Sequence, residues 1–139
     1  MEPRATRVGV VQFTSTAAVE QNLHAVERTV RKAVLEGAEV VLVPESFAYL
    51  GPESGKFAVA ESIEDGGPVL DRMKSLAKET GAHLVLGGHI ERGHRHTHVR
   101  NSSVHLTPDG EVKAVYRKIH LFDVDLPDGT HLLESDTVE

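Results

Sequence analysis

Apolar residues in the first part of the chain follow two spacings, one typical of strands and one typical of helices. Residues 7–13 and 39–43 are short runs rich in β-branched side chains, which predict two buried strands. A strand, a helix and a second strand in this order form a right-handed unit with parallel strands. The helix between them is predicted from apolar residues three and four positions apart, with Gly37 as its stop signal: Leu23, Val26, Val30, Ala33 and Val34.

The same order of elements returns in the middle of the chain. Gly66-Gly67-Pro68 precedes a helix with one apolar stripe that ends at Gly81, and a third strand is predicted at 83–87. Residues 101–106 and 112–116 then flank a Thr-Pro-Asp-Gly turn, which predicts an antiparallel hairpin. We therefore expect one α/β domain, with a mixed sheet, two helices covering one face and an apolar opposite face. After the hairpin, from Asp123 to Glu139, the chain is polar and aperiodic, which predicts a turn at Pro127-Asp128-Gly129 and no terminal helix.

Composition and charge narrow the class of protein. The chain has 139 residues, of which 40% are hydrophobic and 26% charged, within the range of one globular domain. Its formal charge of -6 opposes binding to phosphate backbones, so we expect no nucleic-acid partner. No apolar run is long enough to span a bilayer and the amino terminus carries no signal-peptide core, so we expect no membrane contact and a cytoplasmic location. The sequence contains no cysteine, which excludes disulfides and thiolate metal sites.

Two ionisable residues directly follow predicted strands, where open α/β sheets assemble their sites. Glu45 comes at the end of the second strand, and its carboxylate can act as a general base. Lys118 ends the fifth strand, near the apolar Tyr116 and Ile119, and its ammonium group can stabilise a developing oxyanion. A solvated glutamate and a lysine that extends to solvent along an apolar edge explain the same positions. Neither side chain is a good nucleophile toward an amide carbon at neutral pH.

Two further groups of residues are candidates for chemistry. Ser46 adjoins Glu45, but neighbouring side chains in an extended segment point to opposite faces, so we expect Ser46 to hydrogen-bond its own loop. His94, His96 and His98 alternate in a way that can bind a transition metal on one side of a strand. Nearby arginines disfavour a cation, so we expect a solvated hairpin loop there and no metal site. Metal-dependent hydrolysis is the enzymatic alternative, and a zinc titration that leaves thermal stability unchanged would remove it.

Several of these segments together resemble the motifs of carbon–nitrogen hydrolases of the nitrilase superfamily. Residues 10–12 are similar to the first strand of that family, residues 44–47 to its glutamate motif, and residues 116–123 to its lysine motif. Residues 87–93 and 122–127 further resemble the Nit-type amidases, the branch that acts on omega-amides and deaminated glutathione. The resemblance runs almost from one end of the chain to the other.

This resemblance implies a fold, a site and a chemistry. The fold is the amino-terminal part of a four-layer α-β-β-α sandwich, so residues 1–139 form a partial carbon–nitrogen hydrolase domain. Glu45 corresponds to the general base, Lys118 to the cation that stabilises the oxyanion, and Glu134 to a second glutamate that positions substrate and base. In the family, a cysteine thiolate attacks the amide or nitrile carbon and forms a thioester that water hydrolyses, without a cofactor.

The family's cysteine lies downstream of the lysine motif, so we expect the nucleophile beyond Glu139 and expect the 139 residues alone to be inactive. The implied partners are a small linear amide, the carboxyl-terminal half and further subunits of a homo-oligomer. A non-catalytic fragment or interaction module with the hydrolase fold is the alternative from a different class. A reading frame that continues through a strand ending in cysteine favours the enzyme, whereas a stop codon after Glu139 favours the module.

Overall fold

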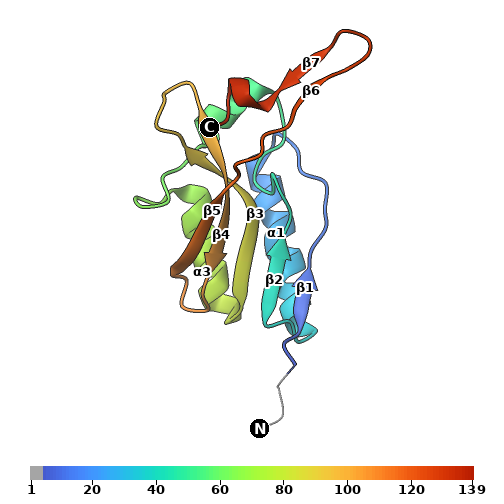
Figure 1. Cartoon of the computed structure of the whole chain (residues 1–139). Coiled ribbons are helices and arrows are strands. Elements are labelled where there is room, and N and C mark those ends of the chain that lie inside the picture. The colour runs from blue at the N-terminus through green and yellow to red at the C-terminus, as the bar shows by residue number, and fades with distance from the viewer. Residues whose placement is uncertain (1–4) are drawn as a thin grey trace.

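The computed structural model describes residues 5–139, and a five-stranded sheet lies at its centre (Figure 1). Parallel pairing joins the first three strands of the spatial order, and antiparallel pairing joins the last two to their neighbours. The predicted mixed sheet, its two β-α-β units and its hairpin are confirmed. In spatial order the strands are β1 (Val8–Val10), β2 (Val40–Val43), β3 (His83–Arg92), β4 (Val99–Leu106) and β5 (Val112–Arg117).

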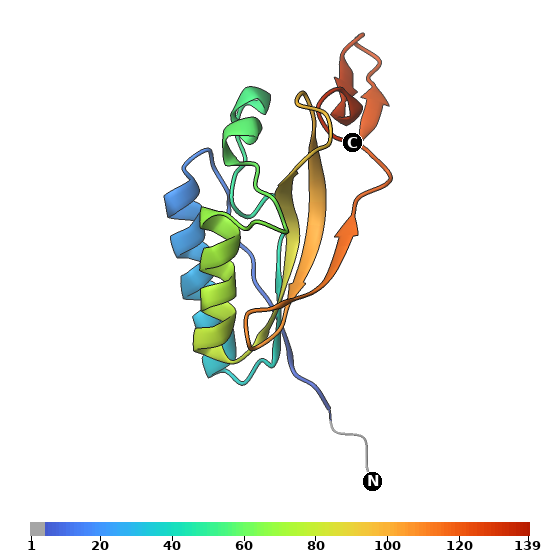
Figure 2. The same ribbon diagram turned by 90° about the vertical axis from the view of Figure 1, so that its left-hand side faces the viewer.

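Two helices, α1 (Val19–Leu35) and α3 (Pro68–Thr80), cover one face of the sheet (Figure 2). The predicted glycines follow both helix ends: Gly81 comes directly after α3 and Gly37 two residues after α1. Their φ angles of 65° and 93° are ones that residues with a β-carbon disfavour. The apolar stripes of the helices pack on the inner side of the sheet and exclude water from it. Fully buried members of this core include Val26, Val30, Leu70, Met73, Leu84, Leu86 and Val104.

A buried carboxylate caps the first turn of α3. Glu61 precedes the helix, and its two oxygens accept the backbone N–H groups of Val69 at 2.7 Å and Leu70 at 2.8 Å. These are amides that a helix cannot pair within itself, and the negative charge also interacts favourably with the helix dipole. Glu61 therefore fixes the start of the helix, together with Pro68 at the first helical position.

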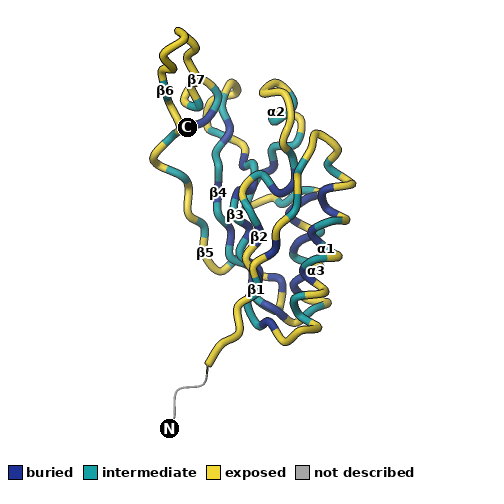
Figure 3. The backbone as a smooth tube through the Cα atoms, turned by 90° about the vertical axis from the view of Figure 1, so that its right-hand side faces the viewer, coloured by how far each residue is buried: buried dark blue, intermediate teal, exposed yellow. Residues whose placement is uncertain are grey.

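The second face of the sheet carries no helix among the residues that the structure describes. A β-carbon on Gly9 would meet Ala33 and Ala38 on the helical side, so Val8 and Val10 point the other way and lie exposed. This face is less apolar than predicted, because His83 and His105 lie across it with ring nitrogens 3.0 Å apart. Burial is concentrated in the middle strands and the inner sides of the helices, and exposure is highest along β1 and β5 (Figure 3).

The strand β3 is longer than the predicted strand at 83–87. It continues to Arg92 across a register shift between Leu86 and His89, where Gly87 and Gly88 interrupt regular pairing. A β-carbon on Gly87 would lie 2.4 Å from the carbonyl oxygen of Val43. Glycine therefore lets the end of β2 approach β3 closely, and this approach places the loop after β2 against the sheet.

Residues 123–139 are more regular than predicted. The strands β6 (Asp123–Asp125) and β7 (His131–Leu133) pair in antiparallel orientation around the predicted turn, and the 3-10 turn η2 (Glu134–Asp136) follows. Each strand has three residues, too few for a period of two to be recognised in the sequence. Two short elements, η1 (Glu53–Gly55) and α2 (Lys56–Val59), lie between β2 and α3. None of the helices within residues 5–139 combines the length and apolarity that a membrane crossing needs.

Candidate active site

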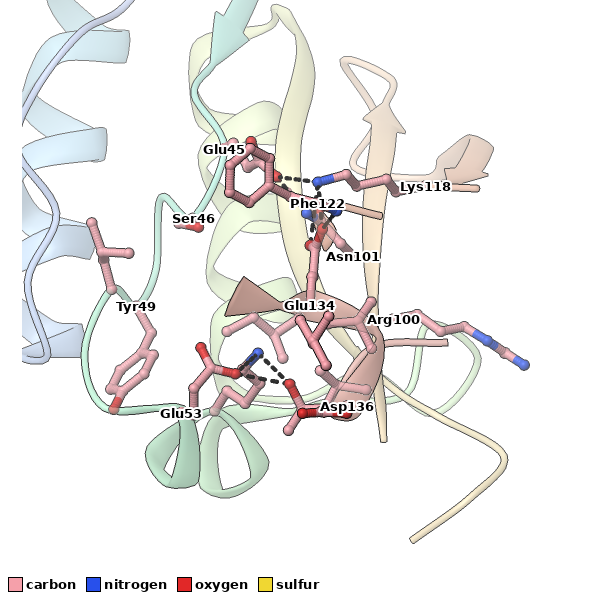
Figure 4. Close-up of a pocket in the computed structure, with 18 of the residues that line it drawn as sticks. Glu45, Ser46, Tyr49, Glu53, Arg100, Asn101, Lys118, Phe122, Glu134 and Asp136 are labelled. Atoms are coloured by element: carbon pink, nitrogen blue, oxygen red, sulfur yellow. Dashed lines mark hydrogen bonds and ion pairs between the residues drawn. The ribbon is translucent and has the colours of Figure 1, made fainter. Parts of the chain in front are cut away.

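Three segments far apart in sequence meet at one end of the sheet: the loop after β2, the residue after β5 and the start of η2. They bring together the three residues singled out from the sequence, Glu45, Lys118 and Glu134 (Figure 4). The Nζ atom of Lys118 lies 2.9 and 3.2 Å from the two carboxylate oxygens of Glu134 and 3.6 Å from Oε1 of Glu45. One ammonium group therefore lies between two carboxylates.

The loop that carries Glu45 is held to the core on both sides. Gly88 leaves room for the Glu45 side chain, because a β-carbon there would lie 2.9 Å from Cγ of Glu45. Phe47 is fully buried under the helices, and Asn22 of α1 donates a hydrogen bond to the carbonyl of Ala48 at 2.9 Å. The Glu45 side chain itself is 58% exposed, so the fold directs it out of the packed sheet into a solvent-accessible space.

The expectation for Ser46 is wrong in its backbone geometry. Ser46 has a φ angle of 53°, in the left-handed region, and lies in a turn instead of an extended segment. Its hydroxyl makes no hydrogen bond within residues 5–139, so the expected bond to its own loop is not formed either. In an extended backbone, side chains alternate between the two faces, and this alternation would point Glu45 back toward the core beside β2. The turn instead directs the Glu45 side chain away from that core.

Lys118 owes its environment to charge instead of apolar neighbours. Two of the apolar residues expected to surround it, Tyr116 and Ile119, are themselves exposed. The hydrogen bond to Glu134 raises the pKa of Lys118, burial partly opposes this, and the charges of Glu134 and Glu45 raise the pKa further. Lys118 therefore stays protonated at neutral pH, as an oxyanion partner must.

Glu134 is the most constrained of the three side chains. Its Oε2 atom accepts the backbone N–H of Phe122 at 2.6 Å in addition to the ammonium of Lys118. Just after it, Thr137 accepts a hydrogen bond from Lys56 at 3.0 Å and donates one to Glu53 at 2.8 Å. These contacts hold the residue that follows η2 against η1 and α2, and only 19% of the Glu134 side chain is exposed.

Asn101 of β4 is a site residue that sequence reasoning missed. Its Nδ2 donates to Oε1 of Glu45 at 2.5 Å, and its carbonyl oxygen accepts the backbone N–H of Lys118 at 2.9 Å. The available signal was an asparagine at the start of a predicted strand, because asparagine is depleted in strands. Which residue it faces depends on the register of β3 against β4, and the irregular pairing at Gly87 and Gly88 sets that register.

These residues line a cleft of about 770 Å³. Its lining combines the Glu45, Lys118 and Glu134 cluster with residues from the loop after Glu45 and from the segment from β7 onward (Figure 4). A volume of this order holds a small organic molecule. The lining residues include Tyr49, Leu50, Lys56, Leu132, Leu133 and Thr137.

The alternating histidines lie away from this cleft. His94, His96 and His98 fall in the loop between β3 and β4, as predicted. The backbone N–H of His94 donates to the carboxylate of Glu139, and the His98 ring contacts the hydroxyl of Thr97. Within residues 5–139, no three histidine, aspartate or glutamate side chains are grouped as a metal site requires.

Comparison with known protein families identifies the family of this chain. Residues 7–139 match the carbon–nitrogen hydrolase family. The chain belongs to that family. The cluster of Glu45, Lys118 and Glu134 thus occurs in a carbon–nitrogen hydrolase domain, and the resemblance read from the sequence motifs is confirmed.

Relatives of this chain include proteins named as amidases and as a hydrolase. A hydrolase of Schizosaccharomyces pombe is 35% identical over 135 residues, which are 97% of this chain and 41% of that protein. A human deaminated glutathione amidase is 35% identical over 134 residues, covering 94% of this chain and 40% of the relative. An omega-amidase of Xenopus tropicalis is 30% identical over 132 residues, covering 95% of this chain and 46% of the relative. The similarity to the Nit-type branch is thereby confirmed, and the chain spans less than half the length of each of these relatives.

The crystal structure of the Caenorhabditis elegans NitFhit protein superposes with a TM-score of 0.85 at 27% sequence identity, covering 98% of this chain and 34% of that one. An amidase from Nesterenkonia superposes with a TM-score of 0.72 at 23% identity, which is a likeness of fold. The predicted fold class, a mixed sheet with two covering helices from the α-β-β-α sandwich of the nitrilase superfamily, is confirmed.

Proposed function

We propose that this chain provides the general base and the oxyanion-stabilising cation of an enzyme that hydrolyses small linear amides. The observation that supports this most directly is the position of Lys118 Nζ, 2.9 Å from Glu134 and 3.6 Å from Glu45. A protonated amine held beside a solvent-accessible carboxylate combines electrostatic stabilisation with proton transfer at one place. Relatives named as amidases support the amide as substrate class.

The reaction requires a thiol that residues 1–139 do not contain. In the proposed sequence of steps, Glu45 takes the proton of a cysteine thiol, and the sulfur forms a bond to the amide carbon. Lys118 stabilises the negative oxygen of the tetrahedral intermediate. The carbon–nitrogen bond then breaks, and Glu45 returns the proton to the departing amine. A thioester is left.

Water completes the cycle at the same carboxylate. Glu45 removes a proton from the water, whose oxygen attacks the thioester carbon, and Lys118 again stabilises the intermediate. The carbon–sulfur bond breaks as Glu45 gives this proton to the sulfur, so a carboxylic acid leaves and both the thiol and the carboxylate base are restored. Glu134 keeps Lys118 oriented and protonated throughout, because its carboxylate accepts two of the hydrogen bonds around the ammonium group.

The test uses the product of the complete reading frame that contains these residues. Amide hydrolysis is measured by release of ammonia from small linear amides, with Glu45→Gln and Lys118→Ala as variants. Each is expected to lower kcat/KM at least roughly a hundredfold, the usual scale for loss of a base or an oxyanion donor. The controls are Lys32→Ala, an exposed lysine in the last turn of α1, and Glu36→Gln, an exposed glutamate just after that helix.

Full turnover in either site variant removes that residue from the mechanism. A reading frame that stops after Glu139, together with no turnover, favours the non-catalytic interaction module instead. A wild-type product that turns over amides but keeps its activity when every cysteine is replaced excludes the thioester chemistry.

A further inference from the structure

One residue of β4 contacts both members of the proposed acid–base pair. The side chain of Asn101 donates to Glu45 at 2.5 Å, and its backbone carbonyl accepts the N–H of Lys118 at 2.9 Å. A carboxylate only accepts hydrogen bonds, so the amide group that faces Glu45 is the NH₂ of Asn101. Because Glu45 and Lys118 lie on separate loops, Asn101 sets the distance between them.

We propose that Asn101 is a positioning residue that occupies Oε1 of Glu45, so that Oε2 is the oxygen that takes and returns the proton. This inference rests on the proposed function, in which Glu45 is the base. It adds the orientation of that carboxylate and the residue that imposes it.

The two oxygens of Glu45 have different surroundings. Oε1 accepts the Asn101 hydrogen bond and faces the Lys118 ammonium group at 3.6 Å. A proton on Oε1 would point at two donors, which disfavours protonation there. Oε2 accepts no hydrogen bond from any residue between 5 and 139, and the side chain borders the cleft. A thiol or a water in the cleft therefore reaches a free lone pair on Oε2.

The backbone of β3 reserves space for this contact. A β-carbon on Gly88 would lie 2.9 Å from Oδ1 of Asn101, 2.9 Å from Cγ of Glu45 and 3.0 Å from the Ser46 nitrogen. Any larger residue at position 88 would push the amide and the carboxylate apart. Without Asn101, a glutamate with 58% of its side chain exposed keeps several rotamers, and only some of them place Oε2 toward the cleft.

The kinetic test uses Asn101→Ala and Asn101→Asp in the complete reading-frame product. Loss of a hydrogen bond to a charged group predicts a roughly tenfold to hundredfold drop in kcat for Asn101→Ala. In Asn101→Asp, a protonated aspartic acid can still donate to Glu45 at low pH, but two carboxylates repel each other at neutral pH. Its pH optimum should therefore move in the acidic direction, which a merely structural role does not produce.

Ser103 provides the matched control. It lies two residues along β4 on the same face of the strand, and its side chain makes no hydrogen bond within the described residues. Ser103→Ala should keep the wild-type rate and pH profile. Unchanged rate and unchanged pH profile in both Asn101 variants would overturn the proposal.

A second measurement needs no nucleophile and uses the 139-residue chain itself. With labelled asparagine, the side-chain amide signals of Asn101 should lie downfield, move as Glu45 is titrated and shift to the values of an exposed amide in Glu45→Ala, but not in Ser103→Ala. Asn101 signals that are identical in wild type and Glu45→Ala would overturn the positioning role. If these signals respond as expected while the complete product shows no amidase activity, the proposed function fails and the Asn101 contact stands.

Discussion

At the scale of single residues, His89 is the side chain whose burial is hardest to reconcile with its chemistry. It is 1% exposed, and neither ring nitrogen has a hydrogen-bond partner within residues 5–139. Its Nε2 atom lies 3.9 Å from the buried carboxylate of Glu61, too far for a hydrogen bond. Burial lowers the pKa of His89 to about 4, although the charge of Glu91 acts in the opposite direction.

This depressed pKa predicts a loss of stability in weak acid. Below its ordinary value near 6.5, the unfolded chain binds a proton on residue 89 that the folded chain refuses until the pH approaches 4. The free energy of unfolding should therefore fall by about 2 kcal/mol between pH 7 and pH 5 through this residue alone. Urea unfolding of wild type and His89→Phe at pH 7 and pH 5 measures this change. In the variant, the free energy of unfolding should fall less between the two pH values.

His96 in the exposed loop between β3 and β4 gives the control. His96→Phe should leave the pH dependence of the free energy of unfolding as it is in wild type. If the free energy of unfolding depends on pH equally in wild type and His89→Phe, the prediction is contradicted.

The sequence indicates candidate site residues that directly follow strands, but it does not indicate where side chains point when this depends on strand register. Glu45 and Lys118 were recognisable because a charged group directly after a strand lies at the rim of an α/β sheet. Asn101 and His89 lie within strands, and whether such a side chain points toward the site, the core or solvent depends on the irregularity between Leu86 and His89. A shift by one residue reverses that choice, and the local sequence does not determine it.

At the scale of elements, a buried carboxylate joins the three strands at the antiparallel side of the sheet. Glu91 of β3 accepts hydrogen bonds from Ser102 of β4 at 2.6 Å and from two nitrogens of Arg117 of β5 at 2.6 and 2.8 Å. Burial by itself would raise the pKa of Glu91, but the bonds from Arg117 and Ser102 outweigh it and hold the pKa below its ordinary value. Lys118 directly follows Arg117, so this contact also fixes where the proposed cation leaves β5.

Removal of the guanidinium should therefore destabilise the sheet. Arg117→Leu leaves the carboxylate of Glu91 buried with the Ser102 hydrogen bond and the longer ion pair to Arg100 at 3.8 Å. We expect a loss of about 2 kcal/mol, because the lost partner was close but is itself half-exposed. Denaturant unfolding at pH 7 measures the loss. Adding Glu91→Leu to Arg117→Leu removes the buried charge that has lost its partner, and should recover part of the lost stability.

The exposed pair of Arg31 and Glu79 between α1 and α3 is the comparison. Arg31→Leu should cost less than about 1 kcal/mol. Equal losses in the two arginine variants would show that the burial of Glu91 has no effect.

Element boundaries were predictable where glycine or proline marks them and not where tertiary contacts extend an element. Both helix ends are followed by glycines in the left-handed region, and α3 begins at Pro68. The extension of β3 to Arg92 requires the partner strand β4 and the backbone bonds between Glu61 and residues 90 and 92. The β6–β7 hairpin likewise depends on strand pairing, which segments of three residues are too short to indicate in the sequence.

At the scale of the whole molecule, the helices leave one face of the sheet uncovered within the described residues. Val8, Val10 and Leu42 are exposed there beside one another on β1 and β2, because β1 pairs with β2 in parallel register. Neighbouring apolar side chains on an open sheet lower the free energy of the chain when a second apolar surface excludes water from them. The 139-residue chain by itself should therefore self-associate through this face.

Val10 allows this to be tested, since 75% of it is exposed and it contributes little to the core. Val10→Lys should raise the dissociation constant for self-association roughly tenfold to hundredfold, the effect of losing one buried aliphatic side chain, as measured by sedimentation equilibrium. Leu35 at the end of α1 is 88% exposed and lies on the helical side of the sheet, so Leu35→Lys adds the same charge and removes a comparable apolar surface elsewhere. If both variants weaken association equally, the added charge is the cause and the open sheet face is not the contact. If only Val10→Lys does so, the surface that associates is the one beside β1.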